Sequence, residues 1–104
     1  MSAILELTIS PMDKGGSLTP YVSRAVGIIK SCGLPYIFGP MGTCIEGEYD
    51  AVMGVARQCF EALKTDCDRI SITMRVDYRK QGENRLAGKV QSVEAELAEL
   101  QGRA

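Results

Sequence analysis

Two segments of the chain alternate apolar and polar residues without a break, and this alternation constrains the fold more than any other feature. The apolar positions are Leu5, Leu7 and Ile9 in residues 3–10, and Ile70, Ile72, Met74 and Val76 in residues 70–77. Because successive side chains of a strand point to opposite sides, each segment predicts a strand with one apolar and one polar face. The fold therefore needs a sheet that buries one of its faces.

Between these two strands the apolar residues change to helical spacing. One apolar stripe runs through residues 18–32 and another through residues 52–63, with apolar positions mostly three or four residues apart. Thr19, which a proline follows, predicts the N-cap of the first helix, and Ser17 is the alternative cap. Asp50 predicts the N-cap of the second helix.

Two short runs of strand-forming residues, 36–38 and 43–48, flank the turn sequence GPMGT. The order of elements is therefore β-α-β-β-α-β, and a last helix follows it. The apolar residues of that helix are spaced four, three, four and three apart: Leu86, Val90, Val93, Leu97 and Leu100. This spacing is typical of a helix that packs along a narrow seam against a partner surface.

The element order predicts an α+β fold of the ferredoxin-like kind. We expect a βαββαβ antiparallel sheet with two helices on one face, plus the C-terminal helix. Right-handed crossovers place the first and third strands side by side at the centre of the sheet. With 104 residues, the chain is expected to form a single domain, residues 1–104.

Composition argues against several classes of partner. The net charge is −1 and the isoelectric point is about 5.4, so neither a nucleic acid nor an anionic membrane is an expected partner. No apolar run approaches the roughly 20 residues that span a bilayer. The first ten residues lack the basic start and cleavage site of a signal peptide, so we expect a cytoplasmic protein.

The reactive residue types are sparse. Four cysteines have irregular spacing without a C-x-x-C pair, and the chain contains no histidine. We therefore predict no metal site, and expect the thiols to be reduced and mostly buried. Since histidine is the commonest general base near neutral pH, its absence also argues against an enzyme. No catalytic residue is predicted.

The polar face of the sheet leaves two interpretations open. If Ile45 points inward, Cys44, Glu46 and Glu48 join the polar side chains of the outer strands on one face. This face is either solvated or enclosed between copies of the chain. Its small residues and the seam of the last helix favour a homo-oligomer. A solvated basic loop is expected nearby, with Arg79, Lys80, Arg85 and Lys89 in and around the polar segment 78–84.

Three motifs point to a known family: the helix start S-x-x-x-YV at residues 17–22, the turn and strand GPMGTCIEGE at 39–48, and RLAGKVQSVE at 85–94. With them, residues 3–96 resemble the small thiamine-binding proteins of the YkoF and MTH1187-like group. The resemblance implies a ferredoxin-like domain without established catalysis. It also implies a homodimer formed through the sheet, or a homotetramer, and thiamine or its pyrimidine half as the ligand.

Six residues are expected to hold such a ligand, and no cofactor is expected besides it. Glu46 would accept from the aminopyrimidine or balance the thiazolium cation, and Ser17 and Thr43 would supply hydrogen bonds. The remaining three would supply a ring face, an adaptable apolar contact and close backbone approach: Tyr21, Met41 and Gly42. Four of the six have an alternative interpretation: the turn position of Met41 is incidental, and the other three have structural roles. Ser17 caps a helix, Tyr21 packs in the core, and Glu46 pairs with Arg75 across the sheet.

Two other functions remain alternatives to ligand binding. One is a structural or regulatory homo-oligomer without a small ligand. The other is a small enzyme that uses Glu46 with Arg75, although no nucleophile–base pair accompanies them. RNA binding is not expected, because the polar face carries no aromatic pair on which bases could stack.

Overall fold

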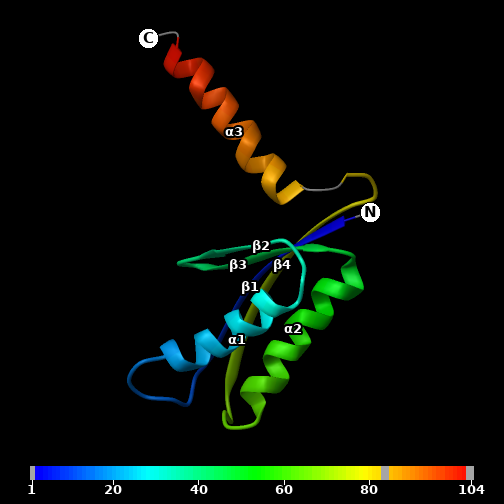
Figure 1. Cartoon of the computed structure of the whole chain (residues 1–104). Coiled ribbons are helices and arrows are strands. Elements are labelled where there is room, and N and C mark those ends of the chain that lie inside the picture. Colours follow the sequence, from blue (N-terminus) through cyan, green and yellow to red (C-terminus); the bar gives the residue numbers. More distant parts are fainter. Residues whose placement is uncertain (1, 83–84, 103–104) are drawn as a thin grey trace.

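The computed structural model describes residues 2–82 and 85–102 (Figure 1). In these ranges the elements are β1 (Ser2–Pro11), α1 (Thr19–Ser31), β2 (Tyr36–Gly39), β3 (Gly42–Gly47), α2 (Tyr49–Lys64), β4 (Ile70–Arg79) and α3 (Arg85–Gly102). Their order is the predicted β-α-β-β-α-β followed by a helix, so the local patterns of the sequence were sufficient to identify every described element.

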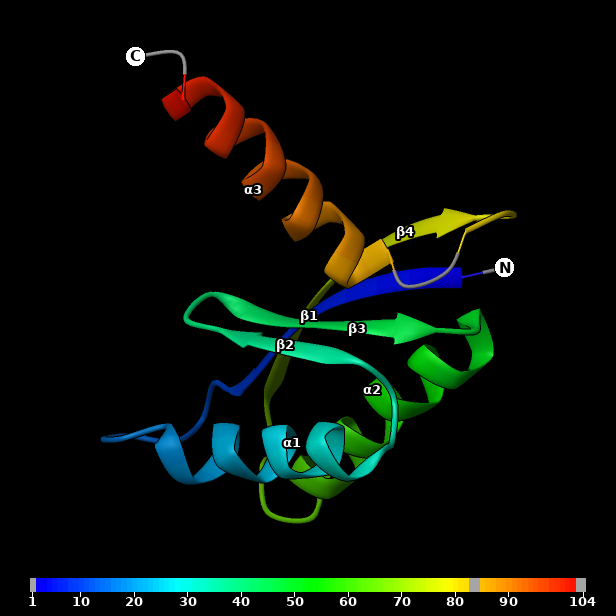
Figure 2. The ribbon, with the colours of Figure 1, turned by 45° about the horizontal axis from the view of Figure 1, so that its top comes forward.

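The four strands form one antiparallel sheet in the order β2-β3-β1-β4. The first and third strands lie at its centre, as predicted. Helices α1 and α2 both cover one face, which we call the inner face (Figure 2). Among the described residues only the start of α3 covers the opposite, outer face, and it does so at one end. The ferredoxin-like α+β prediction is therefore confirmed.

The core lies between the inner face and the two helices. In the register of the sheet Leu5 is opposite Ile45 on one side and Val76 on the other. Leu5 and Ile45 are fully buried, and they pack with Val52 and Cys59 of α2. The predicted inward direction of Ile45 is confirmed. Cys44 and Glu46 consequently lie on the outer face.

Strand β4 departs from the expected burial. Its apolar side chains share the inner face, because Ile72, Met74 and Val76 are opposite Ile9, Leu7 and Leu5. They nevertheless remain about 40% exposed, at 39%, 42% and 43% respectively. Since β4 is an edge strand, the helices cover the central strands better than this edge. The predicted face is right, but these three residues belong to the rim of the core.

Several element boundaries differ from the prediction. The N-cap of α1 is Leu18, so Thr19 is already helical, and the N-cap of α2 is Glu48 instead of Asp50. Strand β4 continues to Arg79, so the first two residues of the expected loop 78–84 belong to the strand. Residues 83 and 84 of that loop lie outside the described residues.

Helix α3 projects away from the rest of the molecule (Figure 1). Its first two residues, Arg85 and Leu86, are buried against the outer face, whereas all later ones are at least partly exposed. Among the helices of the described ranges none is long and apolar enough to cross a membrane.

Candidate functional site

The hairpin of β2 and β3 is shaped by a close approach to β1. Gly39 pairs with Gly42, so Pro40 and Met41 form the two-residue turn. The Thr8 hydroxyl donates a hydrogen bond to the Met41 carbonyl at 3.0 Å. A Cβ at Gly42 would lie 2.8 Å from Thr8 Oγ1, and the φ of Gly42 is +151°. Only glycine fits both the backbone angle and the space here.

A cavity of about 260 Å³ lies between this hairpin and α1. We call it the hairpin pocket. Residues 38–43 of the hairpin, residues 7–10 of β1 and four apolar residues of α1 line it: Val22, Ala25, Val26 and Ile29. Thr43 lies on the inner face opposite Leu7 and is 4% exposed. The described lining contains no ionisable side chain, so the pocket suits an uncharged group.

A more open groove of about 650 Å³ adjoins the pocket along the outside of α1. The two share Val22, Val26 and Phe38, so they meet at these three residues. Phe38 is 58% exposed. A ligand longer than the pocket can therefore continue into the groove past an aromatic ring.

Three of the six predicted ligand residues come together at this pocket, namely Met41, Gly42 and Thr43. Ser17 and Tyr21 are not among its lining residues. The Ser17 hydroxyl accepts a hydrogen bond from the Thr19 backbone N–H at 3.3 Å. Tyr21 packs against the core, and the Arg24 guanidinium lies 5.5 Å from the centre of its ring. The core packing considered for Tyr21 is therefore observed, whereas the capping role considered for Ser17 is wrong, because Leu18 is the N-cap and Ser17 contacts only the first residue of the helix.

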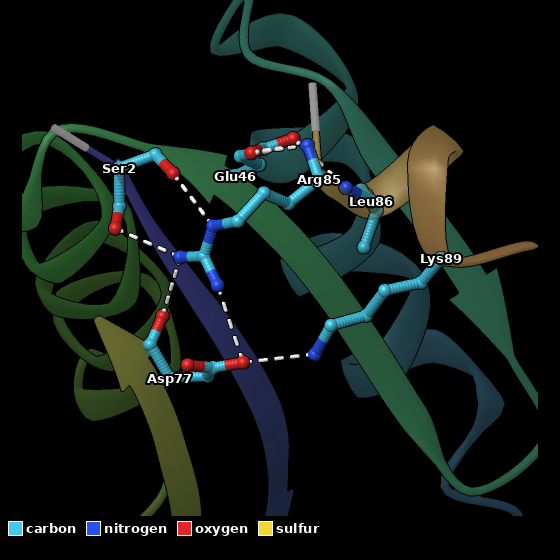
Figure 3. A network of polar contacts seen from close by, with 6 residues as sticks. All are labelled: Ser2, Glu46, Asp77, Arg85, Leu86 and Lys89. Carbon is cyan, nitrogen blue, oxygen red and sulfur yellow. Dashed lines mark hydrogen bonds and ion pairs between the residues drawn. The ribbon is translucent and has the colours of Figure 1, made fainter. Parts of the chain in front are cut away.

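Glu46, the sixth residue, lies on the outer face, away from the pocket. Its carboxylate accepts hydrogen bonds from the backbone N–H groups of Arg85 at 2.8 Å and Leu86 at 3.1 Å (Figure 3). A carboxylate at this place accepts hydrogen bonds from the first backbone N–H groups of α3, which have no partner within the helix. Its negative charge also interacts favourably with the positive end of the helix dipole. The alternative pairing with Arg75 is not observed, since Arg75 is opposite Glu6 in the register.

Arg85 holds the start of α3 to the sheet, a role that the sequence did not indicate. Its Nε donates to the Ser2 hydroxyl, and its Nη2 donates to the carbonyls of Ser2 and Asp77, each at 2.8 Å (Figure 3). Its Nη1 forms an ion pair with the Asp77 carboxylate at 3.2 Å. Arg85 is 7% exposed, so the expectation of a solvated basic loop is wrong for this residue.

Lys89 extends the same network from the next turn of α3. Its ammonium group donates to the Asp77 carboxylate at 2.8 Å. This contact, followed by the charge of Arg85, lowers the pKa of Asp77 below its ordinary value. We call these residues the α3 root network: Ser2, Glu46, Asp77, Arg85, Leu86 and Lys89. Its polar groups are mostly satisfied within the chain, which indicates a structural role.

The thiols offer little nucleophilic chemistry. Burial raises the pKa of Cys59 to about 11 and also raises the pKa of Cys44, so both stay protonated near neutral pH. Across the described ranges no three cysteine or acidic side chains are grouped to hold a metal ion. The described residues therefore form a largely apolar pocket between the hairpin and α1 and a separate structural polar network on the outer face.

Together, the βαββαβ fold and the hairpin pocket define a small ferredoxin-like domain with a ligand-sized cavity between its sheet and its first helix. The family model for thiamine-binding proteins matches residues 5–94. The chain belongs to this family, and the resemblance read from its motifs is confirmed.

Relatives and solved structures agree with this membership. A UPF0045 protein of Methanothermobacter thermautotrophicus is 34% identical over 95 residues, covering 88% of this chain and 96% of the relative. The crystal structure of a UPF0045 protein from Methanocaldococcus jannaschii has a TM-score of 0.81 at 28% identity, covering 89% of this chain and 96% of that chain. A Thermotoga maritima protein, provisionally assigned to thiamine biosynthesis or salvage, has a TM-score of 0.79 at 25% identity, with coverages of 89% and 99%.

Proposed function

We propose that this protein binds thiamine or a related aminopyrimidine in the hairpin pocket, without catalysing a reaction. The observation that supports the proposal is a largely apolar cavity next to a buried hydroxyl, in a member of the thiamine-binding family. An apolar pocket with one or two directional polar groups is the usual form of a small-molecule site. Thr43 supplies the side-chain hydroxyl, and the hairpin supplies backbone groups.

The dimensions of the pocket favour the pyrimidine half of thiamine as the group bound inside it. About 260 Å³ is slightly below the roughly 300 Å³ at which sites for larger ligands begin. The uncharged lining suits a neutral ring and not a thiazolium cation, whose burial without a partner is costly. In whole thiamine the thiazolium would extend into the groove along α1, where the face of Phe38 can attract a cation.

The same geometry bears on the two alternatives. An enzyme built on Glu46 and Arg75 is disfavoured, because both oxygens of Glu46 already accept hydrogen bonds from α3. A homodimer through the outer face of the sheet remains part of the proposal. Its support is that Ile37, on this face beside Cys44, is 45% exposed. A purely structural homo-oligomer would leave the hairpin pocket without a ligand.

The test is a thermal unfolding series with millimolar thiamine and, separately, hydroxymethylpyrimidine. A ligand that binds only the folded state stabilises it by about 2.7 kcal/mol when the free ligand concentration is one hundred times the dissociation constant. The midpoint temperature of unfolding should therefore rise. Titration calorimetry then supplies the affinity of the wild type and of Thr43→Val, which removes the hydroxyl with little change in shape. We expect the variant to bind roughly tenfold more weakly.

Thr73→Val is the matched control, because Thr73 lies on the outer face of β4 outside the pocket lining. Its affinity for the ligand should equal that of the wild type. If neither compound raises the unfolding temperature, the proposal is wrong for these ligands, and the structural homo-oligomer becomes the better explanation. Equal losses in the two threonine variants would exclude the hairpin pocket as the site.

A further inference from the structure

Strand β1 continues beside β4 past the end of the hairpin (Figure 2). Its pairing with β3 ends at Leu7, which is opposite Thr43, whereas its pairing with β4 runs on to Pro11. Residues 8–11 therefore have a neighbouring strand on the β4 side only. We call their other side the open edge of β1. Backbone N–H and C=O groups that point to such an edge need a partner other than a strand of the sheet.

The backbone groups of Ile9 point to the open edge. Successive residues of an antiparallel strand direct their N–H and C=O groups to its two sides in turn. A Cβ at Gly42 would lie 3.3 Å from the Leu7 carbonyl oxygen, so Leu7 directs its groups toward β3. The Met12 N–H donates to the Arg69 carbonyl at 2.7 Å, on the β4 side. Since Ile9 is two residues after Leu7 and three before Met12, both observations direct its N–H and C=O to the open edge.

The open edge forms one wall of the hairpin pocket. Residues 7–10, consecutive along β1, all belong to the lining. Because consecutive side chains of a strand alternate between its faces, such a run means that the pocket lies along the edge of the strand. No described strand lies opposite Ile9 on this side, and no described hydrogen bond of a turn or loop reaches its backbone. An unpaired donor and acceptor in an apolar cavity favour a ligand that bonds to both.

We propose that the backbone N–H and C=O of Ile9 recognise the ring of the ligand. This inference rests on the proposed function, which assigns a pyrimidine to the hairpin pocket, and it defines the chemical class that fits. A ring nitrogen accepts from the Ile9 N–H, and an amino group on the neighbouring ring carbon donates to the Ile9 carbonyl. The ligand class is therefore nitrogen heterocycles with an amino group adjacent to a ring nitrogen. The aminopyrimidine of thiamine has this pattern.

A strand of another polypeptide fits the open edge less well than such a ring. The next residue of β1 that faces this edge is Pro11, which has no N–H. Proline is tolerated there because its missing N–H would point away from β4. The open edge therefore offers one complete donor–acceptor pair, at Ile9, and cannot extend a ladder. A planar ring needs only one such pair.

The first experiment measures the solvent exchange of single backbone amides by NMR, with 4-aminopyrimidine and, separately, hydroxymethylpyrimidine at millimolar concentration. The Met74 amide is the internal control. Met74 is opposite Leu7, which directs its groups toward β3, so the Met74 N–H points away from the sheet. In the free protein Ile9 should exchange as fast as Met74 and much faster than Leu7. Either compound should slow Ile9 roughly tenfold when nine-tenths of the protein is bound, and leave Met74 unchanged.

The outcomes separate this inference from the proposed function. If 4-aminopyrimidine slows the exchange of Ile9, but thiamine and hydroxymethylpyrimidine leave the unfolding temperature unchanged, the inference holds and the proposed function is wrong for those two compounds. If hydroxymethylpyrimidine raises the unfolding temperature without slowing Ile9, the proposed function stands and recognition by Ile9 is wrong. An Ile9 amide that exchanges as slowly as Leu7 in the free protein, or that neither compound slows, also overturns the inference.

The second experiment removes one hydrogen-bonding group at a time and measures affinity by NMR titration. On the ligand, 4-methylpyrimidine has nearly the shape of 4-aminopyrimidine but no amino donor. It leaves the Ile9 carbonyl unpaired and should bind roughly tenfold more weakly. On the protein, the α-hydroxy acid analogue of isoleucine at position 9 replaces the N–H by an ester oxygen and keeps the side chain. This ester variant should also bind 4-aminopyrimidine roughly tenfold more weakly.

The matched control is the corresponding ester at Met74. Thr8 precedes Ile9 and Thr73 precedes Met74, and these two threonines are opposite each other in the register. Each ester therefore weakens one carbonyl acceptor of the same pair, so the two variants should lose similar stability. Only the ester at Ile9 should lose affinity. Equal affinities of the two ester variants, or of the two pyrimidines, would overturn the proposal.

Discussion

Thr43 and Glu46 lie three positions apart on β3, yet they serve opposite faces of the sheet. Thr43 points inward to the hairpin pocket, where the surroundings are apolar and space is left open. Glu46 points outward, where its carboxylate is buried against the start of α3 beside the Arg85 guanidinium. Because the separation is odd, the pleat of the strand sends the two side chains to different sides.

The contrast between the two faces shows how one strand can separate ligand binding from the attachment of a helix. The inner face keeps its polar groups few and its cavity open, as a ligand site requires. The outer face uses its charged groups to fasten a helix that then projects from the body (Figure 1). Substitutions on the inner face should therefore change ligand affinity, whereas those on the outer face should change stability and the attachment of α3.

The largest expected effect is at Arg85. Arg85→Ala removes a buried guanidinium, so the partly exposed Asp77 carboxylate keeps only its pair with Lys89, and the Ser2 hydroxyl and the carbonyls of Ser2 and Asp77 lose their donor. Each hydrogen bond from a charged donor contributes about 1.5–3 kcal/mol, so the loss of several such bonds should cost several kcal/mol of stability. Denaturant unfolding should show a loss of this size, and hydrogen exchange should show α3 protected less than α1.

Lys80→Ala serves as the control, because Lys80 is an exposed basic residue close to the same strand end. Its stability should stay within about 0.5 kcal/mol of the wild type. The affinity of a stably folded Arg85 variant for the ligand should not change. If ligand affinity falls in parallel with stability, the two faces are not independent and the division proposed above is wrong.

A smaller effect is expected on the hairpin itself. Gly42→Ala forces a Cβ to within 2.8 Å of Thr8 Oγ1 at a φ of +151°. Strain of this kind costs about 1–3 kcal/mol, and the shifted turn should also weaken ligand binding. Gly54→Ala in α2 should instead raise the stability, because a Cβ there meets no atom within 4 Å. Alanine stabilises the middle of a helix by about 0.5–1 kcal/mol relative to glycine. Urea titration of both variants measures the change in the free energy of unfolding. Equal changes in the two variants would contradict the prediction.

Local patterns explain how much of the fold the sequence could predict. Alternation at Leu5–Ile9 and helical spacing in the two central stripes depend on near neighbours, so they identified the elements and the inner face. The exposure of Met74 was not predictable in this way. It depends on how far the helices reach across the sheet, which no single segment encodes.

The candidate site was predictable only in part for the same reason. The glycines and proline of the turn are local signals, and they led to Met41, Gly42 and Thr43. Alternation placed Glu46 on the outer face, but its partner Arg85 is 39 positions away in the sequence. Nothing near Arg85 distinguishes it from the exposed basic residues around it. Because of the resemblance to a ligand-binding family, Glu46 was predicted in the same site as Thr43. In the structure the two residues lie on opposite faces of the sheet.

The smallest expected effect concerns the ion pair that joins the two inner-face helices. Arg24 of α1 holds the Asp66 carboxylate, beyond the end of α2, with two hydrogen bonds of 2.8 and 3.1 Å. The contact with Arg24 lowers the pKa of Asp66 to about 2. Because the ordinary value is about 3.9, the unfolded chain takes up this proton first as the pH falls. The stabilisation is complete above pH 4 to 5 and is lost as the pH approaches 2.

Asp66→Asn should therefore lower stability slightly at pH 7 and leave the difference from the wild type near zero at pH 2. Both groups are partly exposed, so solvent screening keeps the loss small. Glu61→Gln, an exposed carboxylate of α2, gives the comparison for general charge effects. Thermal unfolding across pH 2–7 makes the measurement. A difference between Asp66→Asn and the wild type that is constant with pH would show that the asparagine disturbs packing, and that the ion pair contributes nothing to joining the two helices.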